Sequence, residues 1–290
     1  MFEELAALNI DYEGWNLCKC VVNLLDTPPE GIYYNKISAS SYLRGNDSAI
    51  DIGESVIQWL ETSGRTVING NQTVRTEVSK ARQSLLLQKH HLPTPKTLVT
   101  NSLERLEEAS EDFKGKSFIV KPNKGGKGAG VQLFASKEEL KSSIDENTLY
   151  SPDDIYILQE YIKPRNSQIT RMEFIGGQFY YAVAVDTSDG FELCPADACD
   201  IEALSKPKFQ IIPQFQFERL SDIESMLQEE KIDIAGIEFV ENENGEKFIY
   251  DINTNTNYNS AAEEAFGPDL KGLKKVARYL QKKLREAYPA

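Results

Sequence analysis

A glycine pair between two strand-like segments limits the fold of this chain more than any other feature. Residues 170–175 and 178–185 are rich in apolar and aromatic side chains, and Gly176-Gly177 separates them. Two consecutive glycines supply the positive φ angles that a two-residue hairpin turn requires. The sequence therefore predicts an antiparallel hairpin here.

A second hairpin is predicted closer to the C-terminus. Residues 234–240 and 247–252 are apolar segments joined by the polar turn ENENG. Polar turn residues between two such segments again favour a hairpin. Before residue 165, predicted helices instead alternate with short predicted strands. The fold class we expect is therefore α/β followed by α+β.

One predicted helix covers residues 78–91 and ends before a proline, because the residue preceding proline disfavours helical geometry. Val78, Ala81 and Leu85 recur at helical spacing, so we expect this stripe to face the core. Lys80 lies near the start of the helix. A lone lysine in such a position is usually a surface residue, so its meaning depends on the other motifs.

The bulk composition is that of an acidic globular protein. The chain has 290 residues and a formal net charge of −13, and this length suits about two domains of roughly 100–200 residues. An acidic chain lacks the electrostatic footprint of a nucleic-acid binder and gains nothing at an anionic membrane, so we expect neither partner. No run approaches the roughly 18 apolar residues of a membrane span, and MFEELAALNI does not resemble a signal peptide. We expect a cytoplasmic protein.

The cysteines and histidines do not predict a metal site. The four cysteines form two close pairs: Cys18 with Cys20, and Cys194 with Cys199. Together they offer four zinc ligands, but their spacings match no common zinc motif, so reduced thiols are the favoured interpretation. The only histidines, His90 and His91, are adjacent and cannot share a helix face. We interpret them as a solvated helix end.

The segment KPNKGGKGAGV, residues 121–131, has the composition of an anion-binding loop. Four glycines lie between two predicted strands, and lysines are interleaved with them. Glycine lets backbone N–H groups curl around an anion, and lysine adds positive charge. The loop is not a Walker A motif, which opens a helix and ends in Lys-Ser or Lys-Thr. Taken alone, it fits a phosphate cradle and a flexible hairpin tip equally well.

The second hairpin carries a set of oxygen ligands. Glu238 and Asp251 are predicted to lie on adjacent strands, and Asn253 shares the face of Asp251 because strand side chains alternate with a period of two. Two carboxylates and an amide oxygen are hard ligands suited to Mg²⁺. The alternative is solvated acids on a strand edge, which the apolar neighbours of both acids disfavour.

Asparagine then recurs at every second position from Asn253 to Asn259, in IYDINTNTNYNS. The spacing is that of a strand, although asparagine favours turns. We expect the strand to end at Asn253 and a polar loop to follow, bordering a substrate pocket. Amides such as Asn255 can hydrogen-bond a substrate there without adding charge.

In this order the motifs resemble those of the ATP-grasp superfamily, and most closely its RimK-type glutamate ligases. The resemblance extends from about Gly31 to Gly267. SKARQSLLLQKHHLPTPKT is similar to the family's lysine-bearing helix, and IVKPNKGGKGAGV is similar to its loop over the phosphates. LQEYI is similar to the adenine hinge, and GIEFV with IYDIN resembles the paired metal-ligand strands.

The resemblance implies an ATP-grasp fold in three parts. Residues 1–75 would form a short pre-ATP-grasp α/β domain. Residues 76–163 would form a small central lid domain with the lysine helix and the glycine loop. Residues 164–290 would form a C-terminal α+β domain with an antiparallel sheet and the metal ligands.

The resemblance also implies roles for individual residues. Arg171 and Lys121 would act in catalysis, close to the phosphates and an acyl phosphate. The implied ATP-binding residues are Lys80, Lys121, Gly126, Lys127, Gly128, Gln159, Glu160, Tyr161 and Ile162. The implied Mg²⁺ ligands are Glu238, Asp251 and Asn253.

Two segments are candidates for substrate contacts. NKISASSYLRGN, residues 35–46, stands where relatives carry a basic, serine-rich substrate loop. We therefore expect these residues to contact a substrate: Lys36, Ser38, Ser41, Arg44 and, from the asparagine series, Asn255. GFELCPADACD, residues 190–200, either lines the acceptor site or forms a structured loop.

The chain departs from the family pattern in three places. The family usually has an acid after the hinge to hold the ribose, but Ile169 stands in that slot with Gln168 beside it. Asp251 stands where glutamate is more usual. The chain also begins with a predicted helix where relatives begin with a strand, so either the first domain lacks its first strand or the chain is truncated.

The implied reaction is ligation of a carboxylate, on an amino acid or a peptide-like molecule, to an amine. ATP would phosphorylate the carboxylate to an acyl phosphate, and amine attack would leave ADP and phosphate. The implied cofactors are ATP and Mg²⁺, and relatives imply a homo-oligomer. Two alternatives stay open: a non-catalytic ATP-binding regulatory or scaffold protein, and an ATP-grasp phosphotransferase.

Overall fold

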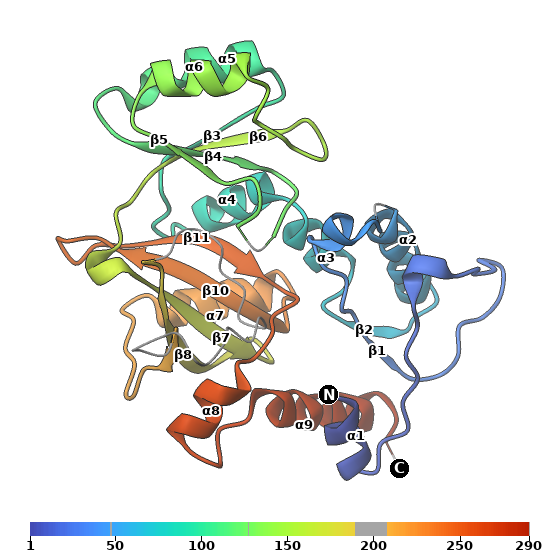
Figure 1. Ribbon diagram of the computed structural model, residues 1–290. Coiled ribbons are helices and arrows are strands. Elements are labelled where there is room, and N and C mark those ends of the chain that lie inside the picture. Colours follow the sequence, from blue (N-terminus) through green and yellow to red (C-terminus); the bar gives the residue numbers. More distant parts are fainter. Residues whose placement is uncertain (47, 127, 189–207, 290) are drawn as a thin grey trace.

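The computed structural model describes residues 1–46, 48–126, 128–188 and 208–289 (Figure 1). Within them the strands form three sheets, ordered β1-β2, β3-β6-β4-β5 and β11-β10-β7-β8-β9. The strands are β1 Ile32–Tyr34, β2 Thr66–Ile68, β3 Thr97–Thr100, β4 Phe118–Pro122, β5 Gln132–Phe134, β6 Tyr156–Glu160, β7 Gln168–Ile175, β8 Gln178–Asp186, β9 Phe209–Ile211, β10 Ile234–Glu241 and β11 Lys247–Asn253. The α-helices are α1 Phe2–Ala7, α2 Ala49–Thr62, α3 Asn71–Glu77, α4 Lys80–Lys89, α5 Leu103–Ala109, α6 Lys137–Asp145, α7 Leu220–Glu229, α8 Ser260–Phe266 and α9 Gly272–Ala287.

The N-terminal part is a small βαβ unit. Strands β1 and β2 pair in parallel, and α2 connects them. The buried residues of α2 recur at helical spacing and include Ile50, Val56, Ile57 and Leu60. The predicted alternation of helices and strands is confirmed here. The sequence did not predict β1, because a three-residue strand carries too short a pattern to detect.

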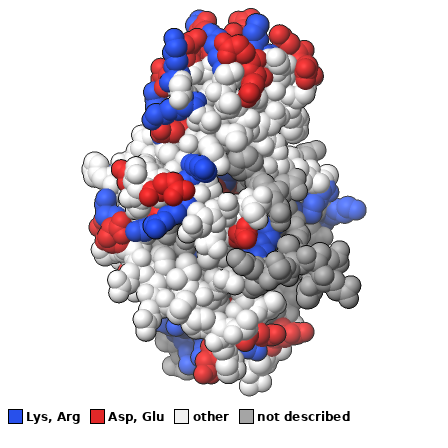
Figure 2. All heavy atoms as spheres, turned by 60° about the vertical axis from the view of Figure 1, so that its left-hand side comes forward, with Lys and Arg blue, Asp and Glu red and all other residues white. Residues whose placement is uncertain are grey.

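The four-stranded sheet is antiparallel, with helices α5 and α6 above it at the top of Figure 1. Leu106 and Leu140, one from each helix, are fully buried with the aromatic side chains of β4 and β5. Surface ion pairs link α6 to the segment after α5, for example Lys137 Nζ to Glu111 Oε1 at 3.0 Å. Figure 2 shows basic and acidic side chains intermingled over this part.

The five-stranded sheet contains both predicted hairpins, which are confirmed. Gly176 and Gly177 have φ angles of 67° and 69° and join β7 to β8. Helices α4 and α7 contribute to the core on one face of this sheet, where Met172 and Phe174 are fully buried. Side chains of the opposite face, such as Arg171, line the cleft described below.

The predicted helix over residues 78–91 is confirmed as α4, which is shorter at both ends. Helix α3 ends at Glu77, and α4 begins at Lys80 with Ser79 as its N-cap. The predicted core stripe is confirmed for Val78, which is buried, and wrong for Leu85, which is 65% exposed. Gln83 is instead 1% exposed, and Leu87 packs in the core.

Helix α4 was predicted to belong to the central lid domain. Its Leu86 and Leu87 share a hydrophobic core with the five-stranded sheet. The predicted domain boundaries at residues 75 and 163 stay predictions. Among the described residues, no helix is long and apolar enough to cross a membrane.

Candidate active site

A cleft of 470 Å³ lies between the four-stranded and five-stranded sheets. This volume is within the range of small-ligand sites, roughly 300–1,000 Å³. Most of the predicted site residues line it: Lys80, Lys121, Gly126, Gly128, Gln159, Glu160, Tyr161, Ile162, Arg171, Glu238, Asp251, Asn253 and Asn255. Lys127 and the segment 190–200, with Cys194 and Cys199, lie outside the described residues.

The central charged residues come from three adjacent strands. Arg171 on β7 pairs in register with Glu238 on β10, which pairs in register with Asp251 on β11. The β10–β11 register shifts next to this pair, so that Tyr250 is an extra, unpaired residue of β11. Such a bulge turns consecutive side chains toward the same face, and both Tyr250 and Asp251 line the cleft.

The three predicted metal ligands converge on one point. Asn253 Nδ2 donates to Asp251 Oδ2 at 2.8 Å and lies 3.4 Å from Glu238 Oε1. The amide thus bridges the two carboxylates. Amide orientation is assigned from the hydrogen-bond network, and a half-turn of the amide would present Asn253 Oδ1 to the same point.

Lys80 forms an ion pair with Asp251 at the start of α4. Burial works against both charges, but the attraction prevails. The pKa of Lys80 is raised by the Asp251 carboxylate despite desolvation, and the pKa of Asp251 is lowered by Lys80 and then Lys121 despite desolvation.

Glu238 lies in an environment that disfavours its charged form. Burial raises its pKa, and the neighbouring Asp251 charge adds to the effect, although Arg171 opposes it. Arg171 Nη1 donates to Glu238 Oε1 at 2.7 Å, and the Tyr250 hydroxyl donates to Oε2 at 3.0 Å.

Lys121 is a buried cation whose close partners are neutral. Its Nζ donates to Gln159 Oε1 at 2.9 Å and lies 5.9 Å from the centre of the Tyr250 ring. Among the described residues, no carboxylate oxygen forms an ion pair with it. Burial, followed by repulsion from Lys80, lowers the pKa of Lys121 to about 8. An anion entering the cleft would supply the missing negative partner.

Two buried side-chain amides that were not predicted from the sequence link α4 to β11 and to the glycine loop. Gln83 Nε2 donates to the Ile252 carbonyl (2.9 Å), and its Oε1 accepts from the Ile252 N–H (3.1 Å). Gln83 therefore anchors β11 between its two predicted metal ligands. Asn123 Oδ1 accepts from the Ser79 hydroxyl (2.9 Å) and the Ala81 N–H (3.1 Å), which ties the glycine loop to the start of α4.

The glycine loop approaches the segment after β1. A Cβ atom on Gly126 would lie 3.1 Å from Ser40 Cβ, and one on Gly125 would lie 3.4 Å from the Tyr42 hydroxyl. Gly128 and Gly130 have positive φ angles of 75°. Larger residues would therefore strain the loop or crowd its neighbours.

The hinge residues lie along the cleft, with some groups already engaged. The Tyr161 N–H donates to the Ser117 carbonyl at 3.1 Å, so it is not available to an adenine ring. The Glu160 carboxylate pairs with Lys116 at 2.7 Å. The Glu160 side chain therefore takes part in an ion pair at the surface.

The position of the missing ribose acid is occupied by neutral groups. Ile169 lines the cleft, and Gln168 beside it is exposed. Ser167, Thr187 and Ser188 also line this end. These three hydroxyl residues were not predicted from the sequence, because Ser167 is distant in the sequence from Thr187 and Ser188 and meets them only where β7 and β8 pair.

The structure brings one end of the predicted substrate loop to the cleft. Ser38 and Ser40 line it, whereas three predicted residues are not among the lining residues: Lys36, Ser41 and Arg44. Lys36 Nζ donates to the Thr256 carbonyl (3.3 Å), and the other two support the loop from outside. The Ser41 hydroxyl donates to the Ser38 carbonyl (2.6 Å), and Arg44 Nη1 donates to Ser40 Oγ (3.0 Å).

Asn255 has one engaged and one unengaged polar atom. Its Nδ2 donates to the Lys36 carbonyl at 3.1 Å, which fixes the orientation of the amide because a carbonyl only accepts. Its Oδ1 is buried and has no donor among the described residues. Buried acceptors normally have partners, so this oxygen is suited to an N–H group of a ligand or a water molecule.

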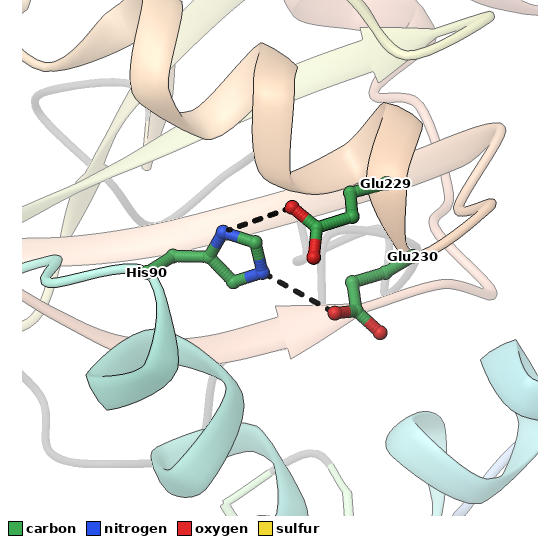
Figure 3. Close-up of side chains that lie close together, drawn as sticks. All are labelled: His90, Glu229 and Glu230. Atoms are coloured by element: carbon green, nitrogen blue, oxygen red, sulfur yellow. Dashed lines mark hydrogen bonds and ion pairs between the residues drawn. The ribbon is translucent and has the colours of Figure 1, made fainter.

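A second cluster of metal-ligating side chains joins the ends of α4 and α7 (Figure 3). His90 Nε2 lies 3.2 Å from Glu230 Oε1, and His90 Nδ1 lies 4.0 Å from Glu229 Oε2. The two ring nitrogens thus face different carboxylates. Lys89 Nζ already lies 2.9 Å from Glu229 and 2.5 Å from Glu230.

We interpret this cluster as a polar link between helices, since the Lys89 ammonium already pairs with both carboxylates. The predicted solvated helix end is wrong for His90, whose side chain is 13% exposed. Cys18 is an exposed free thiol, and Cys20 is a partly buried one.

Comparison with known proteins assigns a family to one part of the chain. Residues 78–192 match the RimK-like ATP-grasp domain family. The tetrahydromethanopterin:alpha-L-glutamate ligase of Methanococcus maripaludis is 25% identical over 126 residues, which are 43% of this chain and 42% of that ligase. The match therefore spans less than half the length of this relative.

Solved structures share the fold over more of the chain. D-cycloserine synthetase DcsG has a TM-score of 0.67 and 16% identity, covering 98% of this chain and 93% of that one. ATP-grasp ligase PsnB, complexed with a phosphomimetic variant of its minimal precursor, Mg and ADP, has a TM-score of 0.58 and 15% identity, covering 87% and 77%. The chain therefore shares the fold of these two enzymes, and its residues 78–192 match the RimK-like ATP-grasp domain family.

Proposed function

We propose that the protein is an ATP-dependent ligase that joins a carboxylate to an amine through an acyl phosphate. One observation carries this proposal: the buried, neutrally partnered Lys121 lies in the same cleft as the paired carboxylates Glu238 and Asp251. A site for MgATP needs both features, because the phosphates require cations and the metal requires oxygen ligands. The ligase relatives named above support the choice of reaction.

The proposed metal ligands fit Mg²⁺ by their chemistry. The Asn253 amide bridges Glu238 and Asp251, and each carboxylate also faces a cation, Arg171 for Glu238 and Lys80 for Asp251. Bound Mg²⁺ would neutralise phosphate charge during phosphoryl transfer. The chain would contribute two carboxylate groups and, after a half-turn of the amide, Asn253 Oδ1.

In the first step, a carboxylate oxygen attacks the γ-phosphorus of ATP, the bond from this phosphorus to the β,γ-bridging oxygen breaks, and ADP leaves. Lys80 and Lys121 bind the phosphates, and Arg171 stabilises the charge on the transferred group. Gly126 and Gly128 lie over this part of the cleft, where the loop would keep water from a hydrolysable intermediate.

In the second step, the amine nitrogen attacks the carbonyl carbon, phosphate leaves, and the nitrogen loses a proton. The substrates would lie at the end of the cleft lined by Ser38, Ser40, Asn255 and Asn257. Asn255 Oδ1 would accept a hydrogen bond from a substrate N–H, which would satisfy an otherwise unpartnered oxygen.

The proposal is tested by screening the full chain with MgATP, the standard amino acids and glycyl dipeptides in the presence of hydroxylamine. We expect substrate-dependent phosphate release with formation of an acyl hydroxamate, because hydroxylamine traps an acyl phosphate. Repeating the productive reaction with an amine in place of hydroxylamine should give an amide, identified by mass spectrometry.

Other outcomes separate the alternatives. Nucleotide binding without phosphate release from any carboxylate would favour the scaffold protein. A phosphorylated product that hydroxylamine does not intercept would favour a phosphotransferase. Neither alternative is favoured by a specific contact in the cleft.

Nucleotide binding should weaken as the pH rises above about 8. The pKa of Lys121 is lowered to about 8 by burial and by Lys80, so the ammonium that attracts phosphate is lost above that pH. Phosphate binding favours the protonated amine, so ATP binding near pH 8 should take up a proton. Calorimetry in two buffers with different ionisation enthalpies measures this uptake.

Lys121→Arg is the matched variant for that prediction, because arginine stays charged throughout this pH range. We expect the proton uptake near pH 8 to disappear in Lys121→Arg. Uptake that is unchanged in this variant would assign the proton to another group.

A further inference from the structure

Arg171 is held by three hydrogen bonds on three sides of its guanidinium group. Nε donates to Glu173 Oε1 at 2.7 Å, Nη1 to Glu238 Oε1 at 2.7 Å, and Nη2 to Thr256 Oγ1 at 2.6 Å. The Thr256 hydroxyl in turn donates to Glu173 Oε2 at 2.7 Å. Arg171, Glu173 and Thr256 are 5%, 2% and 2% exposed, so the network is largely buried.

The guanidinium also lies directly over the backbone of β10. A Cβ atom on Gly236 would lie 2.4 Å from Arg171 Nη2 and 2.6 Å from Nε. Only glycine leaves room for the group in this position. The strand below and the Glu173–Thr256 pair at one side thus define a single orientation of Arg171.

The partners of the three hydrogen bonds differ in their proposed roles. Glu238 is a proposed metal ligand, so any cation that binds it competes with Arg171 Nη1. Glu173 and Thr256 are not among the cleft-lining residues and have no such competitor. When Glu238 turns to another partner, Nε and Nη2 keep the guanidinium in place, and Nη1 becomes available to an anion in the cleft.

We infer that Glu173 and Thr256 are positioning residues that aim Arg171 Nη1 at the phosphoryl group being transferred. This inference rests on the proposed function, because the role of Arg171 belongs to it. Glu173 keeps a buried negative charge beside the guanidinium, and Thr256 links this charge to the asparagine-rich segment. The segment therefore has two faces: Asn253, Asn255 and Asn257 line the cleft, and Thr256 contacts the buried Arg171.

The chain offers a matched control in Thr254. It is also 2% exposed, and its hydroxyl also bonds a buried glutamate, since Thr254 Oγ1 lies 3.0 Å from Glu77 Oε2. The two threonines thus share burial and chemistry, but only Thr256 contacts Arg171. Thr→Val substitution keeps the shape of each side chain and removes the hydroxyl.

The experiment compares Thr256→Val, Thr256→Ser and Thr254→Val in the full chain, with two readouts. The first is kcat and the KM for ATP, using the carboxylate identified by hydroxylamine trapping. The second is the ¹⁵N–¹H resonance of Arg171 Nε, assigned by its loss in Arg171→Lys. We expect Thr256→Val to lower kcat about tenfold or more with a small change in KM, and to shift or broaden the Arg171 resonance.

Thr256→Ser should restore both readouts, and Thr254→Val should leave both near wild type. Equal losses in Thr256→Val and Thr254→Val would overturn the inference, because a general packing defect would then account for them. An unchanged Arg171 resonance in Thr256→Val would overturn it as well. If the wild type ligates no carboxylate, the proposed function and the catalytic role of Arg171 both fail, whereas the resonance alone still reports whether Thr256 holds the guanidinium.

Discussion

Asp251→Asn should lower the rate of ATP turnover roughly 100- to 1,000-fold, the usual cost of losing one charged contact to a transition state. Asp251 touches Lys80 and Asn253 and pairs in register with Glu238, so it is the residue that joins the proposed metal and phosphate contacts. Asparagine keeps the size of the side chain and removes its charge. The measurement is steady-state ADP release at saturating MgATP with the productive carboxylate.

Glu241→Gln is the control for that experiment. Glu241 ends β10, the partner strand in the same hairpin, and pairs with Arg165 at 3.0 Å, with its side chain 32% exposed. Exposed pairs of this kind contribute roughly 0–1 kcal/mol, so turnover should stay within about twofold of wild type. Turnover by Asp251→Asn at the same level as this control would contradict the assignment of Asp251.

Asn69→Ala should destabilise the protein by about 3–5 kcal/mol. Asn69 is fully buried with φ of 56°. Its Nδ2 donates to the carbonyls of Ile234 (2.8 Å) and Thr254 (2.9 Å), and its Oδ1 accepts from the N–H groups of Asp233 (2.9 Å) and Ile234 (3.0 Å). One side chain thus joins the N-terminal βαβ unit to the five-stranded sheet and to the asparagine-rich segment.

The readout is the thermal midpoint of unfolding, which should fall by roughly 10 °C. Asn9→Ala is the control, because Asn9 has a similar φ of 52° but is exposed. The control separates the backbone cost of a positive φ angle from the loss of the four bonds. Equal midpoints for the two variants would show that the bonds of Asn69 contribute little.

The parts of the site that could be predicted lie close together in the sequence. Glu238, Asp251 and Asn253 belong to one hairpin, so strand period and turn position were enough to place them on one face. Lys121 lies beside the glycine loop in a single strand. These predictions needed only local geometry.

The parts that could not be predicted depend on contacts between distant segments. Gln83 is polar, and a helical stripe is found by looking for apolar residues, so the buried face of α4 was assigned to Leu85 instead. Gln83 is buried because β11 offers it the N–H and carbonyl of one residue, Ile252. Nothing in the sequence of the helix shows that partner.

The asparagine-rich segment was predicted in part. Its asparagines at positions 253, 255 and 257 line the cleft, in agreement with a polar border, whereas Asn259 caps α8 through the Ala262 N–H. The intervening Thr254 and Thr256 received no role from the sequence, because their partners Glu77 and Glu173 lie about 80 or more residues away along the chain. Their burial emerges only from the assembled fold.

Isotope transfer tests the central claim most directly. The productive carboxylate substrate is labelled with ¹⁸O in its carboxyl group, and the phosphate released during ligation is analysed by mass spectrometry. An acyl phosphate leaves one carboxyl oxygen on the phosphate, so we predict one ¹⁸O atom in each phosphate, with ADP as the other product. Unlabelled phosphate would contradict the proposed ligation, and AMP with pyrophosphate would contradict it equally.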